Sequence, residues 1–402
     1  MERLQLFSET FVWYEGTEVL CYNSNNGRSF HMQVKTQSLS SVLDNILNIS
    51  NLYIVPLTIM EGEAAELKEF VIRIEELGMG RILRDGKEGF SLPPTLRILN
   101  DITHMKDEGI HTYNVLKYLQ EIVIYIGGNH SESPLFRQVI YPINTPQELS
   151  VPDIDKFITQ VGIDSHVKIH IVISSVTKDI DLLIQKLLNR QGYTEFCYSI
   201  ESLSKMTDGF MEIMEKQVHV KVIISPDDTY RLQGMRVPLN PKYEYTFLVD
   251  SVDAIQNAKQ IISNFGLDRY NIVGIWNDNI AFLKEQVFLS KKEIIESKPS
   301  KRVLFIHQSV NLNYWGKLIL MPDKQIYSDI QGNAIGSMDE PISVMVQREM
   351  ISGRSWTRTR DRIPNDKCPA CLYKWLCPGF SPIESVSGYL ACGERMLNTK
   401  KE

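Results

Sequence analysis

Four of the six cysteines lie close together near the C-terminus, where their spacing could bind a metal ion or cluster. Cys368 and Cys371 form a CxxC pair, five residues separate Cys371 from Cys377, and fourteen separate Cys377 from Cys392. A CxxC turn presents two sulfurs to one metal, so thiolates at this density can hold zinc or an iron–sulfur cluster. Two disulfides would suit an exported chain, but the opening residues show no signal pattern, and a metal site is therefore favoured.

The cysteine spacing and its flanks resemble the SPASM domain, the C-terminal extension of radical SAM enzymes that modify peptides. Outside the cysteines the agreement extends to five further residues, Ser355, Trp356, Arg360, Tyr373 and Pro378. The resemblance implies one auxiliary [4Fe-4S] cluster, with zinc as the alternative, on four ligands: Cys368, Cys371, Cys377 and Cys392.

Two departures from the family pattern indicate that only one auxiliary cluster is kept. Ser381 stands where the family has a cysteine that serves the other auxiliary cluster. The upstream Cys-Gly-x4-Cys pair is also missing from the sequence. The resemblance thus implies a SPASM-like iron–sulfur domain over residues 299–402 with a single cluster.

Composition and charge place the chain among ordinary globular proteins. Its 402 residues are enough for two or three domains, and 43% hydrophobic with 23% charged residues are usual values. The net charge of −6 gives no basic footprint for nucleic acid or an anionic membrane. No apolar run approaches the length of a membrane span, so we expect a cytoplasmic protein.

Residues 1–93 are expected to form a small separate domain. Residues 11–34 have the pattern of two strands joined by the turn-rich segment 23–27. Helical stripes follow over Ser38–Ile49 and Glu61–Leu77, and a small wing is predicted over Arg81–Phe90.

This order of elements resembles the PqqD-like winged-helix element that binds precursor peptides for ribosomal peptide modification. The resemblance implies that the leader of a precursor peptide adds a strand to the sheet edge. That edge is expected at Trp13–Tyr22 or at Arg28–Val34, beside the helix over Ser38–Ile49. A structural cap on the larger domain is the alternative. Cys21 is expected to be a buried, apolar-like residue in this domain.

Residues 94–298 alternate between short apolar runs and helical patterns. Repeated strand–helix units predict a parallel α/β sheet with right-handed crossovers. Helices are expected over Lys178–Asn189 and Val252–Phe265. Six such units resemble the partial (βα)6 TIM-like barrel of radical SAM enzymes. The expected strands are Leu119–Ile126, His166–Ser174, Thr194–Ile200, Val218–Ile224, Tyr245–Val249 and Asn271–Trp276.

The barrel region lacks the residues that would make it a radical SAM enzyme. The family carries CxxxCxxC after the first strand, but here the strand runs into Gly127–Gln138, which contains no cysteine. Cys21 and Cys197 lie far away and alone in the sequence. We therefore expect a degenerate barrel without catalytic or cofactor-binding residues and without cleavage of S-adenosylmethionine. Gly127-Gly128 is weak support for residual cofactor binding.

No substitute chemistry emerges from the remaining motifs. His166 and His170 share one face of a strand but lie about 13 Å apart, so the pair is not expected to bind a metal. No nucleophile elbow, phosphate loop or zinc-protease motif is present. The strand-ending carboxylates are favoured as ordinary loop and helix-cap residues: Asp227, Asp228, Asp250 and Asp278.

The third region begins with a predicted strand over Arg302–Ile306. A hairpin is predicted from Trp315–Leu320 and Gln325–Tyr327, followed by a helix over Pro341–Met350. SPASM proteins have such a hairpin just before their cluster cysteines.

Together these features resemble the pseudo-radical-SAM proteins found beside true radical SAM maturases in Bacteroidales-type peptide modification systems. The resemblance implies a non-catalytic accessory protein that binds a precursor peptide, a radical SAM maturase, or both. Two other hypotheses stay open. The single cluster could serve as an electron relay, or the barrel mouth could carry out an unrecognised reaction.

Overall fold

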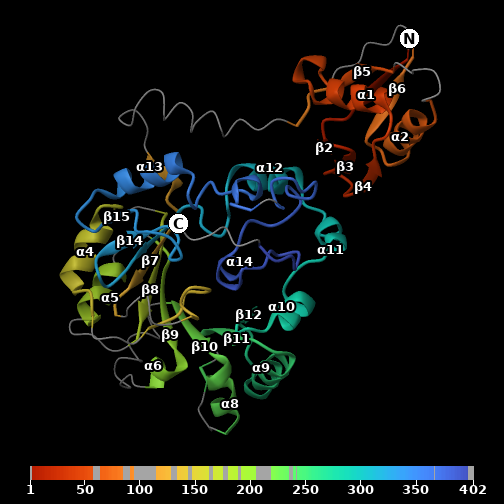
Figure 1. Ribbon diagram of the computed structural model, residues 1–402. Helices are drawn as coiled ribbons and strands as arrows, with labels where there is room; N and C mark the ends of the chain where they lie inside the picture. Colours follow the sequence, from red (N-terminus) through yellow and green to blue (C-terminus); the bar gives the residue numbers. More distant parts are fainter. Residues whose placement is uncertain are drawn as a thin grey trace.

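The computed structural model describes most of the chain and has a mixed α/β architecture. Among the described residues, the strands form one nine-stranded, mostly parallel sheet and two three-stranded sheets (Figure 1). None of the described helices combines the length and the apolar character needed to cross a membrane. The described ranges are 2–57, 64–84, 91–94, 115–127, 134–143, 147–162, 166–174, 180–188, 192–204, 219–234, 239–240, 242–365 and 367–396.

The N-terminal region contains both small sheets. Strands β1 (Arg3–Leu6), β5 (Ile54–Pro56) and β6 (Gly80–Leu83) form an antiparallel sheet with β1 in the centre. The second antiparallel sheet has the order β2-β3-β4, and its strands span Thr10–Glu15, Glu18–Asn23 and Ser29–Gln33.

Residues 11–34 therefore form three strands where two were expected. The sequence signal that was missed is Gly16, whose positive φ of 60° allows a tight turn between β2 and β3. As a result β3 pairs on both sides, and the outer strands β2 and β4 form the two edges.

The two helices predicted for this region are confirmed. Helix α1 (Gln37–Leu47) is capped by Thr36, whose side chain accepts a hydrogen bond from the Leu39 amide. It is followed by a short 3-10 helix, η1 (Ile49–Asn51). Helix α2 spans Ala64–Glu76. Cys21 is fully buried in this core, as predicted. The tip of the expected wing, residues 85–90, lies outside the described residues.

The large sheet is built from six parallel strands that neighbour one another in chain order. Parallel strands joined in this order by right-handed crossovers place their connecting helices on one face. All six strand predictions are confirmed, and so are the two helices predicted between them. The strands are β7 (Glu121–Tyr125), β8 (Lys168–Ile173), β9 (Thr194–Ser199), β10 (His219–Ile224), β11 (Glu244–Val249) and β12 (Tyr270–Gly274).

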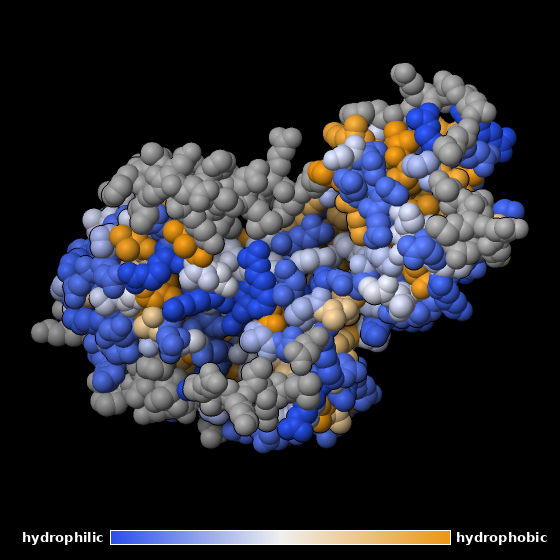
Figure 2. Space-filling view, turned by 45° about the horizontal axis from the view of Figure 1, so that its top comes forward, coloured by the Kyte–Doolittle hydropathy of each residue, from blue (hydrophilic) through white to orange (hydrophobic). Residues whose placement is uncertain are grey.

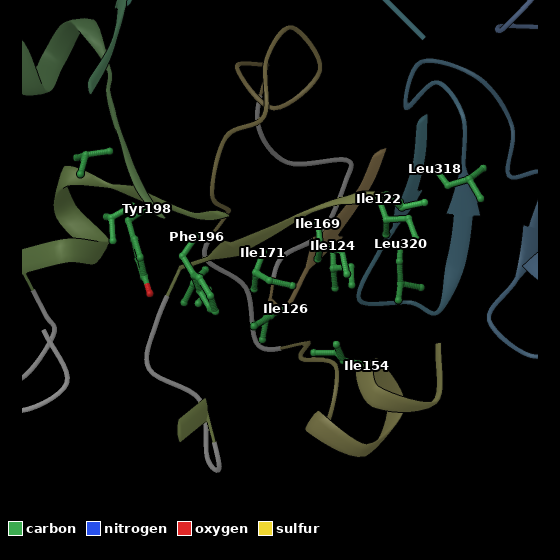
Figure 3. Packing of buried hydrophobic residues seen from close by; sticks show 14 of the residues in the cluster. Ile122, Ile124, Ile126, Ile154, Ile169, Ile171, Phe196, Tyr198, Leu318 and Leu320 are labelled. Atoms are coloured by element: carbon green, nitrogen blue, oxygen red, sulfur yellow. The ribbon is translucent and has the colours of Figure 1, made fainter. Parts of the chain in front are cut away.

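One face of the sheet packs on helices (Figure 1). Alternate strand residues point to this face, and Figure 3 shows the isoleucines of β7 and β8 pointing toward Ile154 of α4. Ile122, Ile124, Ile169 and Ile171 are fully buried there. The described helices between the strands are α4 (Val151–Thr159), α5 (Ile180–Leu188), α6 (Ile200–Ser204), α8 (Pro226–Gly234) and α9 (Val252–Phe265).

The other face of the sheet is covered in part by residues 134–143, which follow β7. Phe136 is fully buried, and its ring meets the Tyr125 ring edge-on at a centroid distance of 4.9 Å. Gln138 connects the segment to Trp276, which follows the edge strand β12. Its side-chain amide donates a hydrogen bond to the Trp276 carbonyl (3.1 Å) and accepts one from the Trp276 amide (2.5 Å). The loop expected at Gly127–Gln138 is therefore partly core. Its residues 128–133 lie outside the described part.

The predicted strand over Arg302–Ile306 is wrong, because these residues belong to helix α12 (Lys301–Ser309). Ser300 caps the helix by accepting a hydrogen bond from the Val303 amide. The run of apolar residues looked like a strand, but Leu304 and Phe305 pack against the N-terminal region as one helical face. Helices α10 (Ile280–Gln286) and α11 (Lys291–Glu296) precede it.

The predicted hairpin is confirmed and extends the large sheet. Strand β13 (Lys317–Leu320) pairs in parallel with β7, and β14 (Gln325–Tyr327) and β15 (Gly336–Ser337) follow as antiparallel neighbours. The predicted helix is also present as α13 (Ile342–Ser352). The remaining short elements are η3 (Val115–Tyr118), η4 (Arg360–Arg362) and α14 (Pro382–Ser387).

The sheet β2-β3-β4 packs on the C-terminal part of the chain. Phe11, Leu20 and Tyr22 share a hydrophobic cluster with residues of α11, α12 and the segment 372–376. The Tyr22 hydroxyl also donates a hydrogen bond to the Pro299 carbonyl at 2.8 Å. In Figure 2 the N-terminal region forms the lobe at the upper right, with hydrophobic residues scattered over its surface.

Candidate metal centre

The four predicted ligands lie in turns between η4 and the end of the described chain. Asn365 starts the first turn, because its side chain accepts a hydrogen bond from the Cys368 amide at 2.8 Å. The amide of Cys371 then bonds the Cys368 carbonyl, and the amide of Cys377 bonds the carbonyl of Tyr373. All six cysteines of the chain are free thiols in this structure.

Three of the four thiols act on one another electrostatically. The pKa of Cys377 is raised to about 12, mainly by burial; Glu384 and the thiols of Cys368 and Cys392 contribute to the increase, and Arg360 opposes it. Burial likewise raises the pKa of Cys368, with Cys392 again contributing. Burial raises the pKa of Tyr373, and Cys371 contributes to this increase.

The thiols are also unequally exposed. Cys368 is buried, Cys371 and Cys377 are half-buried, and Cys392 is exposed. Cys392 lines an open cavity of about 250 Å³ together with Lys284 and Glu293. A metal bound here would therefore have one side toward the protein and one side toward solvent.

The spacing of the sulfurs is wider than the shell of one zinc ion. Tetrahedral zinc with Zn–S bonds of about 2.3 Å brings its sulfurs to roughly 3.8 Å from one another. Among the described His, Cys, Asp and Glu residues, the only three ligand atoms within 4.8 Å of one another belong to a different group. Thiolates of a [4Fe-4S] cluster each bind a different iron and so lie farther apart than the ligands of one zinc ion.

A buried ion pair holds the cysteine-bearing segments together. Arg360 and Glu384 are 2% and 1% exposed, and the guanidinium forms two parallel bonds to the carboxylate, at 2.6 and 3.0 Å. Arg360 also donates to the carbonyls of Pro378 and Gly379, directly after Cys377. The Glu384 carboxylate accepts a hydrogen bond from the amide of Ala391, directly before Cys392, at 2.7 Å.

Ser381 has a clear structural role. Its hydroxyl accepts a hydrogen bond from the Glu384 amide at 3.3 Å, and its own amide bonds the Glu384 carboxylate at 2.8 Å. These reciprocal bonds form a capping box at the start of α14. The serine is thus part of the frame around Arg360 and Glu384.

A second group that could hold a metal lies on the large sheet, and the sequence analysis did not predict it. The Nδ1 atom of His170, a carboxylate oxygen of Glu195 and the Sγ atom of Cys197 lie within 4.8 Å of one another. These residues come from β8 and β9, and all three are buried. Cys197, which looked isolated in the sequence, therefore has polar neighbours.

The group belongs to a belt of alternating charges that crosses the sheet near the amino ends of its strands. Each contact joins side chains on neighbouring strands. The belt consists of Lys317–Glu121 (3.3 Å), Glu121–His170 (3.7 Å), His170–Glu195 (2.9 Å), Glu195–Lys221 (3.0 Å), Lys221–Glu244 (3.4 Å) and Glu244–Asn271 (3.0 Å).

This belt is balanced by the protein's own cations. Burial alone would raise the pKa of Glu195, but His170 and Lys221 lower it from 4.5 to about 2. Burial also raises the pKa of Cys197 well above its usual range, so its thiol keeps the proton that it donates to Glu195 at 3.5 Å. Lys221 already neutralises the Glu195 carboxylate. We therefore interpret the group of His170, Glu195 and Cys197 as part of an ion-pair network.

The other predicted polar residues have local roles. Asp228 accepts hydrogen bonds from the amide and hydroxyl of Ser225, next to the start of α8, and Asp250 accepts one from Asn277. This agrees with the loop and cap roles favoured for them. His166 is exposed, whereas His170 is buried in the belt, so the two do not form a common site. His130, in the cysteine-free segment after β7, lies outside the described residues.

Comparisons with known proteins give no assignment for this chain. No model of a known protein family matches it, and no curated protein sequence does so either.

The ion pair yields a first prediction. Replacing Arg360 with Met should lower the free energy of unfolding by about 3–5 kcal/mol, because Glu384 would stay buried without its partner. Urea unfolding followed by tryptophan fluorescence measures this. The same replacement at the exposed Arg354 is the control and should change the free energy by no more than about 0.5 kcal/mol. Equal effects of both variants would contradict the structural role of Arg360.

The charge belt yields a prediction about pH. The pKa of Glu195 is lower in the folded state, so its stabilising effect is full above pH 4.5 and is lost as the pH falls toward 2. Glu195→Gln should be less stable than the wild type at pH 7, by roughly 3 kcal/mol.

That difference should shrink as the pH falls through this window, since the wild-type side chain then becomes protonated and neutral. Thermal unfolding between pH 2 and pH 7 tests this, with Glu285→Gln on the exposed side of α10 as the control. A difference that stays constant with pH would show that Glu195 is not stabilised as an anion.

Proposed function

We propose that the protein is a non-catalytic, pseudo-radical-SAM accessory protein that binds an extended precursor peptide at the edge of β4. The observation that carries this proposal is the open backbone edge of that strand. Three further features support it: the order of the large sheet, the covering of its inner face, and the cysteine centre.

The edge of β4 has a row of backbone groups that point away from the sheet. The Val34 amide donates a hydrogen bond to the Thr17 carbonyl, and the Asn23 amide donates one to the Arg28 carbonyl. With this register, the backbone N–H and C=O groups of the even-numbered residues of β4 point toward β3. The backbone groups of Ser29, His31 and Gln33 therefore face outward. Among the described residues none of these outward groups has a hydrogen-bond partner. Such an edge is a template for an added strand.

The opposite edge, β2, is less suited to this role. Both the amide and the carbonyl of Thr10 are already bonded, to Phe7 and Tyr53. Tyr14 contacts Ser40 of α1, so the helix that was expected beside the peptide lies at β2 instead. The neighbour of β4 is α2, whose Arg73 lies over the Phe30 ring.

The large sheet is compatible with a degenerate partial barrel. Its six parallel strands follow chain order, as they do in a (βα)6 barrel. Residues 134–143 cover the inner face, and the cavity left beside Phe136 and Tyr314 among the described residues measures about 80 Å³. That is well below the roughly 300–1,000 Å³ of typical pockets for ligands of moderate size. This cavity alone would not hold a ligand of moderate size.

The cysteine centre would hold one [4Fe-4S] cluster on Cys368, Cys371, Cys377 and Cys392. No three of the four sulfurs lie within 4.8 Å of one another, which is wider than the shell of one zinc ion, and Arg360 opposes the burial that raises the pKa of Cys368 and of Cys377. A bound cluster would order a segment that has little regular structure of its own.

An electron-relay role is the second candidate, and the exposure of Cys392 favours it. A cluster with one ligand at an open cavity could exchange electrons with a partner protein. A reversible redox change of the bound cluster that supports a partner's activity would distinguish this role from simple scaffolding.

Metal content tests the cofactor directly. Protein made without oxygen should contain about four iron and four sulfide per chain. Replacing Cys368, Cys371, Cys377 and Cys392 together with Ser should remove both. Replacing Cys197 alone should leave both unchanged. Protein with neither iron and sulfide nor zinc would contradict the metal centre, and zinc alone would favour the alternative metal.

Peptide binding can be tested at a single backbone group. A peptide is first selected from a display library of random 20-residue sequences on the full, metal-loaded chain. His31→Pro removes one outward amide without touching the bonds to β3, and proline is tolerated at such an edge position. We expect it to weaken binding of the selected peptide at least tenfold.

His31→Ala is the matched control, because it removes the same side chain and keeps the amide. It should bind the peptide several-fold more tightly than His31→Pro. Equal affinity of wild type and His31→Pro, measured by fluorescence anisotropy, would rule out strand addition at β4.

A further inference from the structure

We infer that the segment between Cys371 and Cys377 forms a second wall of the peptide site, so that metal binding and peptide binding strengthen each other. The inference rests on the proposed function, since it concerns the same edge of β4. It adds a specific contact residue, Tyr373, and a coupling between two sites that the sequence keeps far apart.

The cysteine segment is the platform on which the peptide-binding sheet lies. Leu372 and Leu376, between the two cysteines, are buried in one cluster with Leu20 and Tyr22 of β3. Lys374 reaches the end of β2, where its ammonium group lies 2.7 Å from the Glu15 carboxylate. The sheet and the metal-binding loop are therefore one packed unit.

Tyr373 lies at the edge of this platform, beside the open strand. It is half-buried, and its ring centroid is 6.4 Å from that of His31 on β4. The ammonium group of Lys291 lies 5.7 Å from the Tyr373 centroid, within the range of a cation–π contact. Tyr373 thus faces the same side of the sheet as His31.

A strand added to β4 would contact both this tyrosine and α2. Side chains of a strand alternate between the two faces of a sheet. One set would point to the side of His31 and Tyr373, and the other to the side of Phe30 and Arg73. The occupant that fits is an extended peptide with apolar or aromatic side chains directed at Tyr373. The row of outward backbone groups selects an extended chain over a helix.

The coupling follows from this shared segment. Metal on Cys371 and Cys377 would restrict the residues between them and so hold Tyr373 in place before the peptide arrives. Less conformational entropy is then lost on binding, and the peptide binds more tightly. By linkage the peptide must stabilise the metal-bound loop by the same factor.

The test compares the selected 20-residue peptide on metal-loaded and chelated chains. Chelation should weaken its binding about tenfold. Tyr373→Ala, which keeps the metal ligands, should weaken binding by a similar factor. Tyr373→Phe should restore it, because the ring is retained. Lys292→Ala, at an exposed position of α11 next to Lys291, is the control and should leave affinity within twofold.

A reciprocal measurement makes the inference independent of protein stability. Saturating peptide should slow the release of iron to a chelator several-fold in the wild type. It should not do so in Tyr373→Ala, although both proteins start with the same metal content.

The outcomes separate this inference from the proposed function. If His31→Pro abolishes binding while chelation and Tyr373→Ala leave affinity within twofold, the peptide uses β4 but the coupling is wrong. If His31→Pro has no effect, both the strand-addition site and the coupling are wrong. A chain that dimerises, with the dimer lost in His31→Pro, would assign the edge to a second copy and overturn the inference.

Discussion

A parallel sheet must be covered on both faces, and this constraint shapes the whole central region. Sequential strand order sends the crossover helices to one face only, where the isoleucines of β7 and β8 meet α4. The other face must be covered by something else. Near the carboxyl ends of the strands, residues 134–143 bring Phe136 onto Tyr125. Near the amino ends, the charge belt fills the same role with side chains that satisfy one another.

The C-terminal segment is stabilised in a different way, because it has very little regular structure with which to build a core. Its frame is the buried pair of Arg360 and Glu384, which bonds backbone groups next to Cys377 and Cys392. Ser381 completes the frame as the cap of α14. The position at which the sequence suggested a missing cluster ligand therefore has a structural role of its own.

Periodicity predicted most of the fold, because apolar runs of the right length have few alternatives. The six strands of the large sheet and the main helices were predicted on this basis. The strand predicted over Arg302–Ile306 failed because the apolar run was short, and the cap at Ser300 with packing on the N-terminal region decided in favour of a helix. Gly16 split one predicted strand into two. The four cysteines were identifiable from spacing, whereas the belt was not, since its members are spread singly over seven strands and only the strand register brings them together.

The belt also bears on how the strands find their alignment. Runs such as Ile169–Ile173 and Val220–Ile224 are apolar at most positions, so a slip by two residues would keep every side chain on its proper face. Such a slip would move Lys221 about 6.6 Å along its strand relative to Glu195 and would break the ion pair between them. One polar or charged residue on each strand thus distinguishes the native strand register from registers shifted by two residues. In a sheet assembled from long-range parallel pairings, that discrimination acts against misaligned intermediates during folding.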